Sequence, residues 1–286
     1  MQTDNLQYQQ MELEPGTFIP QLGGPYPQDD PFTRLYHPVY DRDFVVDEHY
    51  PFVNDSWRER WMHFWAYPVL LYLIQGLRLR LGWGMKTEGR KWLRKYRKQL
   101  KGGAITIANH CHRNDAEAVL VSVGANRHTK IPMFAPNFAT KDQFMLRAVG
   151  GVPIPPVEAG MAAMKQFNLA FDEFHRRGWW FHVFPEAVKW NWYKPLRPFQ
   201  KGAFTMAYKY NMPLVPCVII YRKREWYYRL FGKKEEPCLT VRILEPILPD
   251  TTQPRKEEVN RLATQAHEAM ERAAGILRNP WPPMEA

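Results

Sequence analysis

After residue 100, short apolar runs alternate with longer stretches in which apolar residues recur at helical spacing. The short runs are rich in β-branched and aromatic residues and predict strands at 104–108, 131–134, 179–184, 214–220 and 239–244. The longer stretches predict helices at 116–123, 161–177, 202–210 and 254–277. This alternation predicts an α/β domain over residues 101–286, in which helices flank a mixed, largely parallel sheet.

Two segments precede this domain and differ from it in pattern. Residues 1–56 are polar, acidic and without periodicity, so we expect an extended or disordered leader of which a segment packs on the body. Residues 57–100 contain an apolar run from Phe64 to Ile74 that is eleven residues long. A helix that spans a bilayer needs about 20 apolar residues, so this run predicts an interfacial or re-entrant helical element. A helix buried in the core is the alternative.

Charge is distributed unevenly along the chain. The formal net charge is +10, yet residues 1–56 hold ten acidic and only two basic residues. Between Arg78 and Lys101, ten lysines and arginines accompany a single acid, Glu88. Such a segment binds polyanions, and the eleven tryptophans favour the headgroup region of a membrane over nucleic acid. We therefore expect residues 57–100 to form basic, amphipathic helices that dock on anionic lipids, and we expect no nucleic-acid partner.

Cysteine usage bears on the compartment. Three cysteines are too few, and odd in number, for a disulfide framework, which favours a reducing environment. Together with the docking segment, this predicts a peripheral or monotopic membrane protein at the cytoplasmic face.

A histidine and an aspartate stand five residues apart just after the first predicted strand. His110 lies in the predicted turn, and Asp115 lies in the first turn of the following helix. In this arrangement the carboxylate can fold back onto the imidazole, fix its tautomer and stabilise its protonated form. The other ring nitrogen can then take a proton from a hydroxyl, which makes His110 a candidate general base. A structural loop histidine beside a capping aspartate is the alternative.

His112 allows a second interpretation of the same turn. With His110 and Asp115 it could form a metal site, because an extended strand would set both imidazoles on one side. The sequence offers no third and fourth ligands at a spacing typical of zinc sites, so we expect no metal.

Three further segments follow in an order that, together with this turn, resembles the glycerolipid acyltransferases. They are Val152-Pro-Ile154 after the tight turn at Gly150-Gly151, Phe184-Pro-Glu186 after a predicted strand, and Lys201-Gly-Ala-Phe204 with Pro213-Leu-Val-Pro216. The resemblance is greatest to the 1-acylglycerol-3-phosphate O-acyltransferase family and covers about residues 100–245. Each motif alone is weak, but four in this order at suitable spacing are specific.

The resemblance implies transfer of a fatty acyl group from acyl-CoA or acyl-carrier protein to a hydroxyl of a lysophosphatidic acid-like acceptor, in phospholipid biosynthesis. The thioester would be a co-substrate, and no resident cofactor is implied. His110 would be the base and Asp115 its support. The substrate-binding positions implied are Lys141, Gly151, Ile154, Phe184, Pro185, Glu186 and Lys189. Of these, Glu186 would bind the acceptor or order its loop, and Lys141 and Lys189 would meet the acceptor's phosphate.

The sequence departs from the family pattern in two motifs. The third usually reads Phe-Pro-Glu-Gly-Thr-Arg, and here Ala187, Val188 and Lys189 hold the last three places. The second usually ends in arginine, and here Pro155 follows Ile154. A lysine keeps the charge but loses the planar, two-pronged grip on phosphate. An acyltransferase for a different lysolipid, and a non-catalytic membrane-binding relative, are therefore the alternatives.

Overall fold

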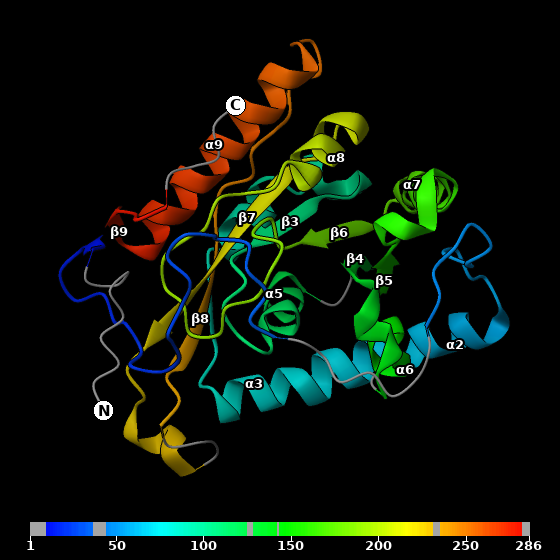
Figure 1. The fold of residues 1–286 in the computed structure, drawn as a ribbon. Coiled ribbons are helices and arrows are strands. Elements are labelled where there is room, and N and C mark those ends of the chain that lie inside the picture. The colour runs from blue at the N-terminus through cyan, green and yellow to red at the C-terminus, as the bar shows by residue number, and fades with distance from the viewer. Residues whose placement is uncertain (1–9, 37–43, 125–127, 142, 231–234, 282–286) are drawn as a thin grey trace.

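The computed structural model describes residues 10–36, 44–124, 128–141, 143–230 and 235–281. Its centre is a seven-stranded sheet in the order β2-β8-β7-β3-β6-β4-β5 (Figure 1). The strands are β2 (Lys86–Glu88), β3 (Ile105–Ala108), β4 (Thr129–Phe134), β5 (Gly151–Ile154), β6 (Trp180–Val183), β7 (Leu214–Arg222) and β8 (Cys238–Ile243). Neighbouring strands are parallel except β7 and β8, which are antiparallel. The prediction of a mixed, largely parallel sheet is confirmed.

Helices cover both faces of this sheet (Figure 1). On one face, Ile105 and Phe181 of the sheet share a hydrophobic core with Leu262 of α9. On the other face, Ala108 of the sheet shares a second core with Leu120 of α5. Successive strand residues point to opposite faces, so β3 contributes to both cores. The helices are α2 (Trp57–Trp65), α3 (Gly76–Gly82), α4 (Arg90–Lys95), α5 (Asp115–Val123), α6 (Gln143–Ala148), α7 (Gly160–Arg176), α8 (Gly202–Tyr210) and α9 (Arg255–Ala274).

The predicted helical element after residue 57 forms a rod. A π-helical segment, η1 (Ala66–Gln75), joins α2 to α3 without a break. The side of the rod that faces the domain buries Tyr67, Leu71 and Leu79. Its other side exposes large apolar side chains, which are Trp57, Trp61, Phe64, Trp65, Leu73, Ile74, Leu77 and Leu81. Among the described residues, no helix is both long and apolar enough to cross a membrane.

The segment 57–100 is not helical throughout. Lys86–Glu88 forms β2, the edge strand that pairs in parallel with β8. Gly89 ends this strand at a φ of +79°, and a Cβ there would lie 1.9 Å from the carbonyl oxygen of Ile243. Only glycine fits so close an approach in the left-handed region, so Gly89 makes the turn from β2 into α4.

The described parts of the leader pack on the domain. Glu12–Leu13 (β1) pairs antiparallel with Ile276–Arg278 (β9), which follows α9. Met11, Tyr26 and Phe52 are buried. Beyond β1, the described leader residues up to 56 hold no regular helix or strand, so side chains rather than a backbone ladder hold the leader in place. Residues 1–9 and 37–43 lie outside the described residues.

Candidate active site

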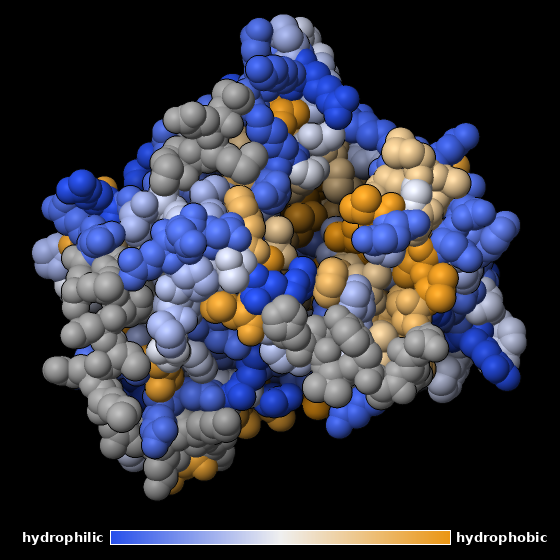
Figure 2. Space-filling view, viewed as in Figure 1, coloured by the Kyte–Doolittle hydropathy of each residue, from blue (hydrophilic) through white to orange (hydrophobic). Residues whose placement is uncertain are grey.

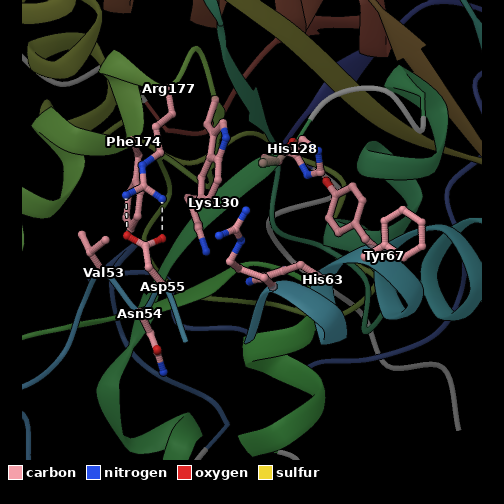
Figure 3. Close-up of a pocket in the computed structure, with 13 residues that line it drawn as sticks. Val53, Asn54, Asp55, His63, Tyr67, His128, Lys130, Phe174 and Arg177 are labelled. Carbon is pink, nitrogen blue, oxygen red and sulfur yellow. Dashed lines mark hydrogen bonds and ion pairs between the residues drawn. The ribbon is translucent and has the colours of Figure 1, made fainter. Parts of the chain in front are cut away.

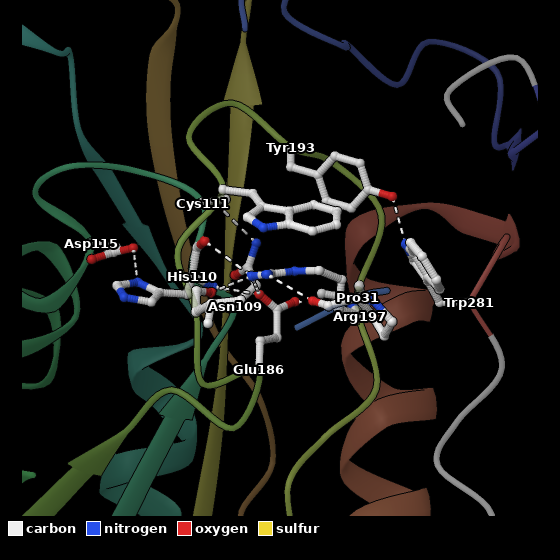
Figure 4. A network of polar contacts seen from close by, with 12 residues as sticks. Pro31, Asn109, His110, Cys111, Asp115, Glu186, Tyr193, Arg197 and Trp281 are labelled. Carbon is white, nitrogen blue, oxygen red and sulfur yellow. Dashed lines mark hydrogen bonds and ion pairs between the residues drawn. The ribbon is translucent and has the colours of Figure 1, made fainter. Parts of the chain in front are cut away.

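His110 and Asp115 meet at the carboxyl end of β3. The turn after β3 carries the imidazole, and Asp115 is the first residue of α5. The Nδ1 atom of His110 lies 2.7 Å from Oδ2 of Asp115 (Figure 4). The same oxygen accepts the backbone N–H of His112 at 3.2 Å, and Oδ1 accepts the N–H of Ala116 at 2.9 Å. The carboxylate is thus held by the helix start and folds back onto the imidazole, as the spacing predicts.

Electrostatics keep Asp115 ionised. Burial alone would raise the pKa of Asp115, but the charge of His110 and the hydrogen bond from it hold that pKa below its usual range. The aspartate is therefore an acceptor for Nδ1–H, and Nε2 is the ring nitrogen left to take a proton. Phe184 stacks on the imidazole, with ring centroids 3.9 Å apart and an angle of 13° between the planes. Stacking and hydrogen bond together fix the ring's orientation.

Glu186 holds the loop after β6 against the turn that carries His110. Its Oε2 accepts the backbone N–H of His110 at 2.9 Å, and its Oε1 accepts the backbone N–H of Arg197 at 3.1 Å. The Arg197 side chain is fully buried, lies 2.7 Å from Oε2 and also donates to the carbonyl of Val188. Both carboxylate oxygens thus accept hydrogen bonds from the chain itself, and Glu186 orders its loop in this structure. A role in binding the acceptor stays a prediction.

Sequence reasoning missed Arg197. No motif marks Pro-Leu-Arg-Pro at 195–198, and an isolated arginine is usually exposed. A buried glutamate needs a buried cation as its partner, which would have pointed to an arginine nearby. That argument requires the burial of Glu186, which is 2% exposed, and the structure alone gives this value.

The remaining positions implied by the resemblance fall into two groups. Pro185 is buried, and its carbonyl accepts the N–H of Gln200 at 2.7 Å. Gly151 starts β5 so close to α6 that a Cβ would lie 2.7 Å from the carbonyl oxygen of Leu146. These two residues shape the backbone. Ile154 ends β5 and is 38% exposed.

The two predicted lysines differ in position. Lys189 is partly buried, and its charge helps to lower the pKa of Asp115, after burial, the charge of His110 and the hydrogen bond from His110. It therefore lies near His110 and Asp115. Lys141 is exposed in the turn before α6, and among the described residues no hydrogen bond or ion pair joins it to His110, Asp115 or Lys189.

His112 and Cys111 are turned into the protein. The Nδ1 atom of His112 accepts the N–H of Asn114 at 3.1 Å, and burial lowers the pKa of its imidazole to about 4. Burial likewise raises the pKa of the Cys111 thiol, so the thiol stays protonated. In the described part of the chain, no group of three or more histidine, cysteine and acidic side chains could hold a metal ion.

The leader contributes to the walls of the site, which sequence reasoning also missed. The carbonyl of Thr33 accepts the indole N–H of Trp190 at 2.8 Å, and that of Pro31 accepts from Arg197 at 3.3 Å. Two cation–π contacts follow. The guanidinium of Arg34 lies 3.7 Å from the centroid of the Phe134 ring. The ammonium of Lys189 lies 5.2 Å from the centroid of the Tyr36 ring.

An apolar surface adjoins these groups. Figure 2 shows a hollow near the middle of this face of the molecule, with hydrophobic side chains around it. The ends of β4 and β5 and the segments that follow them expose several large apolar side chains, which are Phe134, Phe144, Met145, Ile154, Val157 and Met161. The turn that carries His110 and Asp115 thus has beside it a surface on which a hydrocarbon chain could lie.

Comparison with known proteins bears on this site. Residues 86–220 match the model of the acyltransferase family. Among solved structures, the chain is similar to the 1-acyl-sn-glycerophosphate (LPA) acyltransferase PlsC from Thermotoga maritima, with 20% sequence identity and a TM-score of 0.50. That similarity covers 78% of this chain and 84% of the other and shows a shared fold. No curated protein sequence matches. The resemblance drawn from the four motifs is confirmed, because residues 86–220 match the acyltransferase family model and the chain shares the fold of a solved LPA acyltransferase.

Proposed function

We propose that this protein transfers a fatty acyl group from a thioester, acyl-CoA or acyl-carrier protein, to a hydroxyl of a lysophosphatidic acid-like acceptor in phospholipid biosynthesis. The single observation that carries the proposal is the 2.7 Å contact between His110 and Asp115, which leaves Nε2 available within an acyltransferase domain. The contacts with Phe184 and Glu186 support it, because they fix the base in place.

The reaction needs one base and no covalent intermediate. Nε2 of His110 removes the acceptor's hydroxyl proton as the oxygen attacks the thioester carbonyl, and Asp115 stabilises the imidazolium that results. The tetrahedral intermediate then collapses, the carbon–sulfur bond breaks, and the thiolate takes the proton from Nε2. A thioester is already activated, so the enzyme supplies no nucleophile of its own. The buried, protonated Cys111 is accordingly given no part in the step.

Two cations suit the acceptor's phosphate. Among the described residues, neither Lys189 nor Arg34 forms an ion pair with a carboxylate, and each lies against an aromatic ring. Arg34 stacks on the last residue of β4, and one strand, β6, separates β4 from the β3 turn. The two strand axes are therefore about 10 Å apart, so an arginine reaching inward could bind a phosphate whose glycerol hydroxyl meets His110. The planar guanidinium supplies the two-pronged grip that Lys189 lacks. Lys141 stays a prediction as a third phosphate contact.

The rod α2–η1–α3 is proposed to dock the domain on a membrane with anionic lipids, at the cytoplasmic face, as a peripheral or monotopic protein. The exposed tryptophans support this, because indole rings settle at headgroup depth, and so does the basic segment that follows. Docking would bring a lysolipid acceptor to the site without extracting it into water.

A different lysolipid is the second candidate acceptor. It is favoured by Lys189 in place of the arginine usual in the third motif and by Pro155 after Ile154. A larger or neutral headgroup would make little use of Lys189 or Arg34, so the two candidates predict different effects of removing these cations.

The test is an acyl-transfer assay with purified protein in neutral detergent, labelled acyl-CoA and a panel of lysolipids. We expect lysophosphatidic acid to be used, and Lys189→Ala and Arg34→Ala each to raise its KM about tenfold or more, because each removes a charge-assisted contact. Arg255→Ala, at an exposed arginine of α9, is the matched control and should leave KM unchanged. Equal, small effects of the two variants on charged and neutral acceptors would remove the phosphate-binding role from both residues.

A further inference from the structure

A second site lies at the edge of the sheet opposite His110. A cavity of about 570 Å³ opens between α2 and the amino ends of β4 and β6 (Figure 3). Its lining includes Lys130 near the start of β4 and Trp179 just before β6. Because β3, β6 and β4 are parallel, their amino ends share one edge, and His110 follows the carboxyl end of β3. The cavity is therefore separate from the catalytic pair.

Lys130 lies in this cavity beside two aromatic rings. Its ammonium lies 5.1 Å from the ring centroid of Phe174 and 4.9 Å from that of Trp179. Among the residues that the structure describes, none forms a hydrogen bond or ion pair with this ammonium. Burial lowers its pKa to about 8, which reflects the cost of holding the charge there. An anion in the cavity would relieve that cost.

The other charged groups of the cavity set its electrostatic balance. Arg177 is bound to Asp55 through two contacts of 2.7 Å and to Glu173 at 2.6 Å, and Arg176 also pairs with Glu173, so these two arginines and two carboxylates are close to neutral together. Arg60 lines the cavity from α2, and its guanidinium makes no hydrogen bond within the described part of the chain. Glu59 acts on Lys130 and offsets part of the charge. A positive surplus of about one unit results, which favours a monoanion over a dianion.

The histidines of the cavity add hydrogen-bonding capacity without charge. Burial lowers the pKa of His63 to about 4, and it also lowers the pKa of His128. Near neutral pH both imidazoles are therefore uncharged, and the charge balance rests on Lys130, Arg60 and Glu59.

The cavity leads to the aromatic surface of the rod. A second hollow shares Asp55, Arg60 and Phe64 with it and extends to Trp57 and Trp61. Both tryptophans are exposed, at 72% and 62%. Cations inside and indole rings at the rim match a molecule with one negative charge close to its hydrocarbon chains.

We propose that this cavity binds the headgroup of a monoanionic phospholipid, with the phosphodiester on Lys130 and Arg60 and the start of the acyl chains against Phe64 and Trp61. The proposal rests on the proposed membrane docking of α2 but not on acyl transfer. A lipid held here would fix the orientation of the domain on the bilayer. The proposed acyl transfer at His110 would take place at the opposite edge of the sheet.

The test uses the full chain in neutral detergent, without thioester or lysolipid, titrated with a short-chain phosphatidylglycerol below its micelle concentration and followed by calorimetry. We expect saturable binding of one lipid per protein, weakened about tenfold or more by Lys130→Met and by Arg60→Gln, each of which removes a charged donor. Lys256→Met, at an exposed lysine of α9, is the matched control for charge and should bind as the unchanged protein does. His110→Ala should also bind normally, which separates this site from the catalytic one.

Four outcomes would overturn the proposal. Absence of saturable binding, or equal affinity of Lys130→Met and Lys256→Met, would show that the cavity cations do not recognise the lipid. Equally tight binding of short-chain phosphatidylcholine would show that the site does not recognise the net negative charge of the lipid. Equally tight binding of inorganic phosphate would identify the site as one for free anions rather than for a lipid.

Discussion

Replacing Arg197 with methionine should lower the free energy of unfolding by about 3–5 kcal/mol, because it strands the Glu186 carboxylate in the interior without its cation. Both side chains are almost wholly buried, at 0% and 2% exposed, so water cannot replace the lost partner. Glu186 would keep two backbone donors, from His110 and from Arg197 itself. It would lose the guanidinium at 2.7 Å, and the carbonyls of Val188 and Pro31 would lose a donor.

The assay is urea unfolding in neutral detergent, followed by tryptophan fluorescence, on a double-mutant cycle. Glu186→Gln combined with Arg197→Met removes both charges, so the double variant should be more stable than the sum of the single effects predicts, by about 2 kcal/mol or more. If Arg197→Met does not fold, recovery of folded protein in the double variant reports the same coupling. Arg255→Met is the control for loss of an exposed arginine. Additivity within about 0.5 kcal/mol would refute the view that these charges depend on each other.

Three further predictions concern other parts of the molecule. Burial lowers the pKa of both His112 and His182 to about 4, so between about pH 6.5 and 4 the unfolded chain binds protons that the folded chain does not. The free energy of unfolding should therefore be full above pH 6.5 and fall on acidification by up to about 3 kcal/mol for each histidine. A urea midpoint that is unchanged between pH 7 and 5 would contradict this. Asp115→Asn should lower kcat by about a thousandfold or more with little change in the acceptor's KM, measured by initial rates, because it disturbs the tautomer of His110 without removing the base. Alkaline carbonate or high salt should release a substantial part of the protein from membranes, and full resistance to both in a sedimentation assay would argue for deeper insertion of the rod.

The sequence predicts well what local patterns determine. Every strand and helix predicted from apolar periodicity after residue 100 is present, and the spacing of His110 and Asp115 sufficed to place the two side chains together. The helix predicted over 254–277 is too long, because Gly275 ends α9 in the left-handed region and Ile276–Arg278 forms β9. Strand β2 was not predicted, because Lys86-Thr-Glu88 is polar and shows no apolar pattern. It lies at the edge of the sheet, and its backbone pairing with β8 identifies it as a strand. A polar edge strand in a basic segment looks like the solvated face of a helix.

Partners far apart in the sequence could not be predicted. Glu186 and Arg197 are eleven residues apart, and the loop between them brings them together only when it folds against the turn at His110. The contact between Trp190 and Thr33 joins residues 157 positions apart. No pattern in an acidic, proline-rich leader indicates which of its carbonyls will meet an indole. The leader's part in the site is therefore a property of the fold.

The most direct test of the account is transfer of a labelled acyl chain from acyl-CoA to lysophosphatidic acid by the unchanged protein and by His110→Ala. The account predicts phosphatidic acid from the first and none above background from the second, with unchanged circular dichroism, because among the described residues His110 alone combines a free imidazole nitrogen with a buried carboxylate support at this turn. Undiminished transfer by His110→Ala, or no transfer by the unchanged protein to any lysolipid, would contradict it.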